Sequence, residues 1–103
     1  MTTVFSKVAN RVLYISMCGE LDESVAVSVR GDLDALISRS DFDRVVIDLS
    51  KLVFMDSTGI GVLIGRYKKL RARNSLVFLA NPTASVDKIL RLSGIYDIMP
   101  KVV

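Results

Sequence analysis

Two short apolar runs on either side of a helix-like segment most strongly constrain how this chain can fold. Residues 44–49 and 76–79 have the length and composition of short buried strands. Between them, apolar residues recur at helical spacing from a point near Ser57: Ile60, Leu63, Ile64, Tyr67 and Leu70. A strand, a helix and a strand in this order are typical of a right-handed parallel crossover. The pattern therefore predicts an α/β domain.

The segments before this unit predict a hairpin and a first helix. Residues 3–8 and 11–19 are apolar-rich runs separated by Ala9-Asn10, which is a hairpin pattern. A helix is expected next, with Asp22 or Ser24 as its N-terminal cap. Its expected core face contains Val25, Val29, Leu33, Leu36 and Ile37.

The segments after the unit predict one more helix and a short edge strand. Asn81-Pro82-Thr83 leads into a helix with Val86, Ile89 and Leu90 on its inner side, and Gly94 is placed as its C-terminal cap. Residues 98–99 and 102–103 can add a final strand. We therefore expect one domain over residues 1–103, a small mixed sheet with helices packed on it, in the order ββαβαβα plus a possible terminal strand.

The composition excludes most kinds of independent catalysis. The chain has no histidine and a single cysteine, Cys18, so Ser-His-Asp triads, Cys-His pairs and the usual zinc sites are excluded. It also lacks the glycine-rich loops that hold phosphates or dinucleotides. We therefore expect no enzyme activity, no cofactor and no metal.

Charge and hydropathy favour a cytoplasmic protein that binds neither membranes nor nucleic acids. No run approaches the ~20 apolar residues of a membrane span, and no signal peptide is visible. The net charge of +3 is mild, and many of the basic residues lie in the predicted helix after Ser57. Tyr67 is the only aromatic residue among these basic residues, and its helical spacing places it on the inner side of the helix, where it could not stack on a base. A solvated helix face is the simplest interpretation.

Ser57 is the residue for which the local pattern leaves two roles open. As a helix cap, its oxygen is placed to accept from the amides of Gly59 and Ile60. The same free amides and the helix dipole favour an added phosphate. Asp56 precedes it, and Asp22 follows the end of another predicted strand. Since ligand and signalling sites favour the carboxyl ends of strands, we expect the two loops to meet.

One side of the same helix predicts a docking strip. On a helical wheel, Val62 falls beside Arg66, opposite the core stripe, and Gly61 and Gly65 give a smooth surface next to them. Two interpretations remain open at this point. The four residues contact a partner, or they pack against a neighbouring element of the same domain.

Three motifs carry a resemblance to a known family. They are Gly19-Glu20-Leu21-Asp22, the block 54–68 (FMDSTGIGVLIGRYK), and Leu92-Ser93-Gly94-Ile95. With these motifs in this order, the chain resembles the STAS domain of bacterial anti-sigma factor antagonists. Residues 65–68 favour the sporulation branch, which acts on the anti-sigma F factor, with the general stress-response branch as the alternative.

The resemblance implies a partner switch. In this family the unphosphorylated antagonist binds an anti-sigma factor that is also a serine kinase, and the sigma factor is released. The kinase phosphorylates the serine after the motif aspartate, here Ser57, and a PP2C-type phosphatase reverses the step. Asp22 and Asp56 match the acidic positions beside this serine, and Thr58 offers a second hydroxyl. We expect these residues and the docking strip to contact the partner, and the free protein to be a monomer.

Two other classes of function remain as alternatives. A STAS module can serve as a sensor or scaffold that binds a nucleotide, a lipid or a regulatory protein. A phosphoacceptor of the response-regulator class would use Asp22, Asp48 and Asp56 as an acidic cluster. That class begins with strand–helix alternation, whereas this chain opens with two strands. Asp48 itself is expected at the surface end of a strand.

Overall fold

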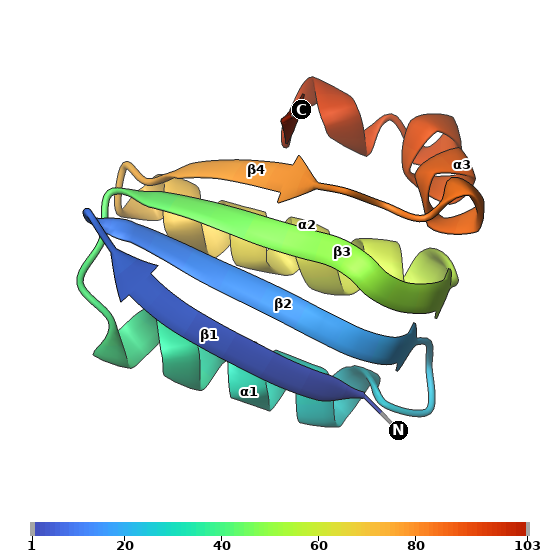
Figure 1. Cartoon of the computed structure of the whole chain (residues 1–103), viewed down its shortest axis with the longest axis horizontal. Coiled ribbons are helices and arrows are strands. Elements are labelled where there is room, and N and C mark those ends of the chain that lie inside the picture. The colour runs from blue at the N-terminus through green and yellow to red at the C-terminus, as the bar shows by residue number, and fades with distance from the viewer. Residues whose placement is uncertain (1, 103) are drawn as a thin grey trace.

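A five-stranded mixed sheet is the frame of the structure, a computed structural model in which residues 2–102 are described (Figure 1). The strands lie in the order β1-β2-β3-β4-β5, with β1 antiparallel to β2 and the other neighbours parallel. This confirms the predicted α/β order. The elements are β1 (Thr3–Ala9), β2 (Val12–Leu21), α1 (Ala26–Arg39), β3 (Arg44–Met55), α2 (Ser57–Ala72), β4 (Leu76–Ala80), α3 (Ala84–Ser93), the 3-10 turn η1 (Ile95–Asp97) and β5 (Lys101–Val102).

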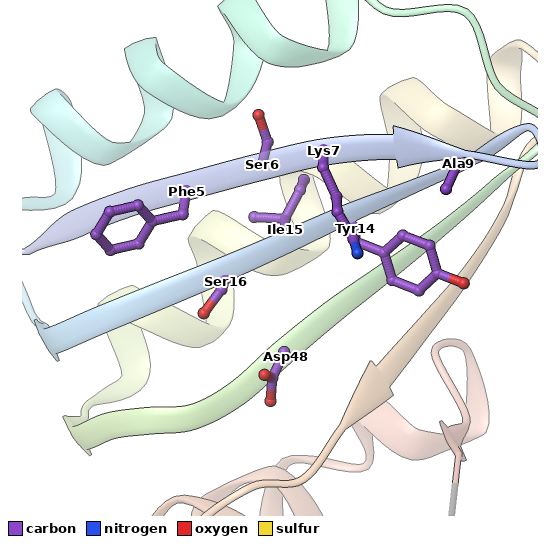
Figure 2. Close-up of a pocket in the computed structure, with 8 residues that line it drawn as sticks. All are labelled: Phe5, Ser6, Lys7, Ala9, Tyr14, Ile15, Ser16 and Asp48. Atoms are coloured by element: carbon purple, nitrogen blue, oxygen red, sulfur yellow. The ribbon is translucent and has the colours of Figure 1, made fainter.

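The two faces of the sheet have different environments. In β2, Leu13, Ile15 and Met17 are buried and face α1 and α2, which lie together behind the sheet in Figure 1. The alternate residues point to the opposite face, where Tyr14 is partly exposed (Figure 2). The predicted core face of α1 is confirmed, except that Val25 precedes the helix and is only half-buried.

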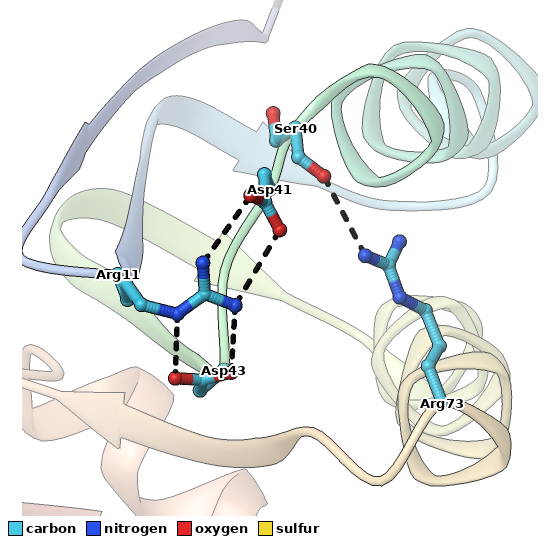
Figure 3. Close-up of polar contacts among 5 residues, drawn as sticks. All are labelled: Arg11, Ser40, Asp41, Asp43 and Arg73. Carbon is cyan, nitrogen blue, oxygen red and sulfur yellow. Dashed lines mark hydrogen bonds and ion pairs between the residues drawn. The ribbon is translucent and has the colours of Figure 1, made fainter.

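The β1–β2 hairpin turns one residue later than predicted. Asn10 and Arg11 occupy the turn with φ angles of 52° and 62°, whereas Ala9 is the last residue of β1. A two-residue turn of this left-handed type matches the twist of the strands. The Arg11 guanidinium holds Asp43 through Nε at 2.8 Å and Asp41 through Nη1 at 3.2 Å (Figure 3). It therefore ties the hairpin to the loop before β3.

Two other boundaries differ from the predictions. β3 continues to Met55, beyond the predicted residues 44–49, because two register shifts against β2 absorb extra residues. Ile98 and Met99 are not in the last strand, and Met99 is instead fully buried after η1. β5 contains Lys101–Val102, and Val103 lies outside the described residues.

The last helix ends as predicted. Gly94 takes a φ of 77° at the C-terminus of α3, a conformation in which a side chain would be strained. Among residues 2–102, no helix is both long and apolar enough to cross a membrane.

Candidate functional site

The carboxyl ends of β2 and β3 lie side by side. Leu21 and Met55 are register partners, and the Asp56 amide donates to the Leu21 carbonyl at 3.3 Å. The loop after β2 and the first turn of α2 therefore meet, as predicted from the strand order, at the right-hand end of the sheet in Figure 1.

Asp56, and not Ser57, caps α2. The Asp56 side chain accepts from the Gly59 amide at 3.1 Å, and its carbonyl accepts from the Ile60 amide at 3.2 Å. The prediction that Ser57 accepts from these two amides is therefore wrong. Aspartate caps a helix at least as well as serine, and here it comes one residue earlier, so Ser57 becomes the first helical residue.

This arrangement leaves Ser57 accessible at the positive end of α2. Ser57 is exposed, whereas Thr58 is half-buried. Their amides are in the first turn, where backbone donors have no partner within the helix. The Asp56 carboxylate accepts from the Gly59 amide as the cap, and no hydrogen bond joins it to the Ser57 hydroxyl among the bonds of residues 2–102. The site thus offers an exposed hydroxyl beside backbone donors that have no partner within the helix.

Gly59 holds the first turn of α2 against β2. A Cβ at this position would lie 2.7 Å from the Leu21 carbonyl oxygen and 2.7 Å from Met55 Cγ. No side chain fits this space without displacing backbone. By contrast, a Cβ at Gly61 or Gly65 would meet nothing within 4 Å.

Asp22 forms a turn rather than a helix cap. Its side chain accepts from the Ser24 amide at 2.9 Å and from the Ser24 hydroxyl at 2.6 Å. The hydroxyl bond holds the pKa of Asp22 below its usual value. Because α1 begins only at Ala26 and Val25 at its cap position makes no side-chain bond, neither Asp22 nor Ser24 is the predicted cap.

The site is acidic although the whole chain is basic. Glu20, Asp22 and Glu23 lie at the end of β2, and Asp56 lies at the end of β3. Within residues 2–102, Asp22 and Asp56 form no ion pair. No three metal-ligating side chains of His, Cys, Asp or Glu gather anywhere in the same residues.

The predicted docking strip is wrong because half of it is buried inside the domain. Val62 is 0% exposed and Arg66 is 8% exposed, since α1 lies along this side of α2. Arg66 Nε is 3.0 Å from Asp34 Oδ1 of α1, at ion-pair distance but not aligned as a hydrogen bond. Lys69 Nζ is 3.0 Å from Asp34 Oδ2. The alternative of packing within the domain is confirmed for Val62 and Arg66, whereas Gly61 is exposed and Gly65 is half-exposed.

The structure also corrects the position of Asp48. It lies within β3, opposite Ser16, and accepts from the Ser50 amide at 3.1 Å. It is thus neither at a strand end nor in one cluster with Asp22 and Asp56, which follow the Leu21–Met55 pair.

Two exposed apolar residues near the site were not predicted. Val27, in the first turn of α1, is 80% exposed, and Phe54, two residues before Asp56, is 47% exposed. The exposure of Val27 could have been predicted from the sequence, because Val27 does not belong to the helical repeat of buried residues in α1.

Comparisons with known proteins find related sequences. Residues 5–103 match the family model of the STAS domain. The chain is 36% identical over 89 residues to an anti-sigma F factor antagonist of Paenibacillus polymyxa, covering 86% of this chain and 76% of that protein. It is 32% identical over 85 residues to an anti-sigma-B factor antagonist of Listeria monocytogenes, covering 82% and 74%.

Solved structures show the same fold. The unphosphorylated form of the anti-sigma factor antagonist SpoIIAA superposes with a TM-score of 0.80 at 26% identity, covering 98% of this chain and 89% of that one. The phosphorylated form of SpoIIAA from Bacillus superposes with a TM-score of 0.71 at 25% identity, covering 98% and 92%.

Proposed function

The chain belongs to the STAS domain family, and we propose that it is an anti-sigma factor antagonist controlled by phosphorylation of Ser57. In its unphosphorylated form it binds an anti-sigma factor and so releases a sigma factor. Phosphorylation of Ser57 by the anti-sigma factor, acting as a serine kinase, ends this binding. The higher identity to the anti-sigma F antagonist, 36% against 32%, favours the sporulation branch over the general stress response.

The exposed position of Ser57 carries the proposal. It is the first residue of α2, it is exposed, and its amide lies in the turn where backbone donors are free. Thr58 offers the other hydroxyl of this turn, but it is half-buried. Ser57 is therefore the better acceptor.

The surrounding charges explain how a phosphate switches binding. It adds roughly −1.5 to −2 charge next to Asp56 and Asp22, neither of which forms an ion pair within residues 2–102. Within the protein, the free amides of the first turn and the helix dipole offset part of this charge. A partner surface that must desolvate the phosphate provides no comparable compensation for its charge. A loss of about 3 kcal/mol at the contact weakens binding by more than about a hundredfold.

The partner must supply the chemistry of phosphoryl transfer. The catalytic base, the metal and the nucleotide site all lie in the kinase, so the chain is a substrate and not an enzyme. A PP2C-type phosphatase resets the switch, and the cycle operates in the cytoplasm.

The contact surface is smaller than the sequence suggested. It includes Asp22, Asp56, Ser57, Thr58 and Gly61, all at the ends of β2 and β3 or in the first turns of α2. Val62 and Arg66 act inside the domain. Gly65 is half-exposed and can border the surface.

One experiment tests this function directly. The protein is incubated with ATP and the anti-sigma kinase of its own genome, and any phosphate is located by mass spectrometry. We expect phosphate on Ser57, none in the Ser57→Ala variant, and unchanged labelling in Ser85→Ala, which alters an exposed serine in the first turn of α3. No phosphorylation and no complex with any anti-sigma factor would disprove the proposal.

A further inference from the structure

Val27 is the most exposed large apolar side chain of the described residues. It is 80% exposed in the first turn of α1, which begins at Ala26. Exposure alone does not make an interaction site, because Leu92 in the last turn of α3 is 79% exposed and single apolar residues are common on protein surfaces. Val27 differs from Leu92 in its position relative to Ser57 and α2.

The contacts between α1 and α2 place Val27 level with the beginning of α2. The two helices lie together behind the sheet in Figure 1, and they run in the same direction because each connects two parallel neighbouring strands. Asp34 of α1 lies 3.0 Å from Arg66 and 3.0 Å from Lys69 of α2. Val27 is seven residues, or about two turns, before Asp34 and therefore lies on the same side of α1. The same step along α2, back from its two cations, leads to residues 59–62.

The helix surfaces on both sides of Val27 are bare. Gly61 of α2 is exposed, and a Cβ at this position would meet nothing within 4 Å. Gly31, one turn after Val27 in α1, likewise has open space where a Cβ would be. Another protein can therefore come close to the backbone of both helices, with the Val27 side chain projecting between them.

The charges on the strand side of Val27 are acidic. Asp22 and Glu23 precede α1, and Asp56 precedes α2. Within residues 2–102, none of these three carboxylates forms an ion pair. An apolar contact with charged groups at its rim is the usual composition of a protein–protein interface. The complementary surface of a partner has an apolar socket for Val27 and basic groups opposite the carboxylates.

We propose that Val27 is an affinity-determining contact for the anti-sigma factor, on a surface that extends from Ser57 across Gly61 to the first turn of α1. The inference rests on the proposed function, and it adds α1 to the contact surface. The anti-sigma factor is the occupant because this surface is continuous with the serine that the same protein must reach. Packed helices lie about 8–10 Å apart, which is well within a standard contact of about 800 Å² on each protein. A partner seated over Ser57 therefore covers Val27 as well.

Val27 contributes to docking and not to phosphoryl transfer. Its side chain has no donor, acceptor or charge, and it belongs to a different helix from Ser57. Loss of its contact should weaken the binding of the chain to the kinase in the ground state and in the transition state alike. Such a loss raises KM and leaves kcat unchanged.

Two serine variants with matched exposure test the proposal by calorimetric titration with the anti-sigma factor of the same genome. Val27→Ser should raise the Kd about ten- to a hundredfold, as expected for the loss of a buried valine contact. Leu92→Ser removes an equally exposed side chain from α3 and should leave the Kd unchanged. Val27→Ile keeps an apolar, β-branched side chain and should bind like the wild-type chain. Urea unfolding should show little change in Val27→Ser, because serine and valine have similar helix propensities.

Phosphorylation kinetics give a second readout. Val27→Ser should raise the KM of the kinase for this protein by a similar factor, with kcat unchanged. Equal affinity of Val27→Ser and the wild-type chain, or an equal loss in Leu92→Ser, would overturn the proposal. Failure of the proposed function has a different signature: the wild-type chain itself would neither bind an anti-sigma factor nor be phosphorylated, and both proposals would fall.

Discussion

The beginnings of α2 and α3 are built alike but carry their charges differently. Each helix follows a parallel strand, and each is capped by a polar side chain. Asp56 caps α2 by accepting from the Gly59 amide at 3.1 Å, and Thr83 caps α3 by accepting from the Val86 amide at 3.4 Å. The backbone geometry of the two sites therefore does not distinguish them.

The two helix starts differ in the partners of their carboxylates. In the first turn of α3, Asp87 accepts from the Tyr96 hydroxyl at 2.6 Å and pairs with Lys101 at 3.1 Å and Arg91 at 3.0 Å. At the start of α2, Asp56 has no cation within the described residues. A paired carboxylate fastens the chain to itself, in this case the C-terminal segment to α3. Next to an unpaired carboxylate, by contrast, no cation of the chain offsets an added negative charge, so a bound partner must accommodate that charge.

The largest expected effect is on partner binding. Ser57→Asp should weaken the complex with the anti-sigma factor by about a hundredfold or more, because it puts a carboxylate where the partner must desolvate it. Ser85→Asp places the same charge in the first turn of α3 and should leave affinity unchanged. Calorimetric titration of both variants measures the difference. If both lose affinity equally, the contrast between the two helix starts is wrong.

The next effect concerns a paired carboxylate in the helix layer. Asp34→Ala removes the partner of Arg66, a residue that is 8% exposed, and should lower the free energy of unfolding by about 2 kcal/mol. Urea unfolding measures this loss. The same variant should keep its affinity for the anti-sigma factor, and a selective loss of binding with full stability would restore the docking strip.

Two glycines at the start of α2 should respond in opposite directions. Gly59→Ala should destabilise the fold by about 1–2 kcal/mol, because its Cβ would lie 2.7 Å from the Leu21 carbonyl oxygen. Gly61→Ala meets open space and should stabilise it by up to about 1 kcal/mol, since alanine is the better helix former. Thermal unfolding of the two variants gives the comparison, and a stable Gly59→Ala would show that α2 is not held tightly on β2.

The smallest effect is a change in acid stability. The Tyr96 hydroxyl and then Lys101 hold the pKa of Asp87 below its usual value. Its stabilisation is therefore complete above a pH of about 3.9, the usual pKa of an unfolded aspartate, and is lost as the pH falls through the lower folded pKa. Asp87→Asn should make stability less dependent on pH in this acid range. Asp22 and Asp43, whose pKa values are also lowered, should keep part of the dependence.

The order of elements was predictable because each depends on local pattern. The periodic residues of α1 and α2 and the apolar runs of β3 and β4 were sufficient for it, and Ser57 was correctly placed at a helix start. The cap was not predictable, because Asp56 and Ser57 are adjacent and both are good capping residues. The burial of Val62 and Arg66 depends on where α1 packs against α2. A helical wheel of α2 alone gives no information about the position of α1. The length of β3 depends on its register shifts against β2.

Hydrogen exchange before and after phosphorylation tests the central claim most directly, namely that the switch is local charge at the start of α2. With stoichiometric phosphate on Ser57, we expect altered amide exchange in residues 22–25 and 56–60 only, where the two loops meet. Exchange in β1, α3 and β5 should be unchanged. Altered exchange spread through the sheet or the C-terminal segment would contradict the account, since it would mean that phosphorylation changes the fold itself.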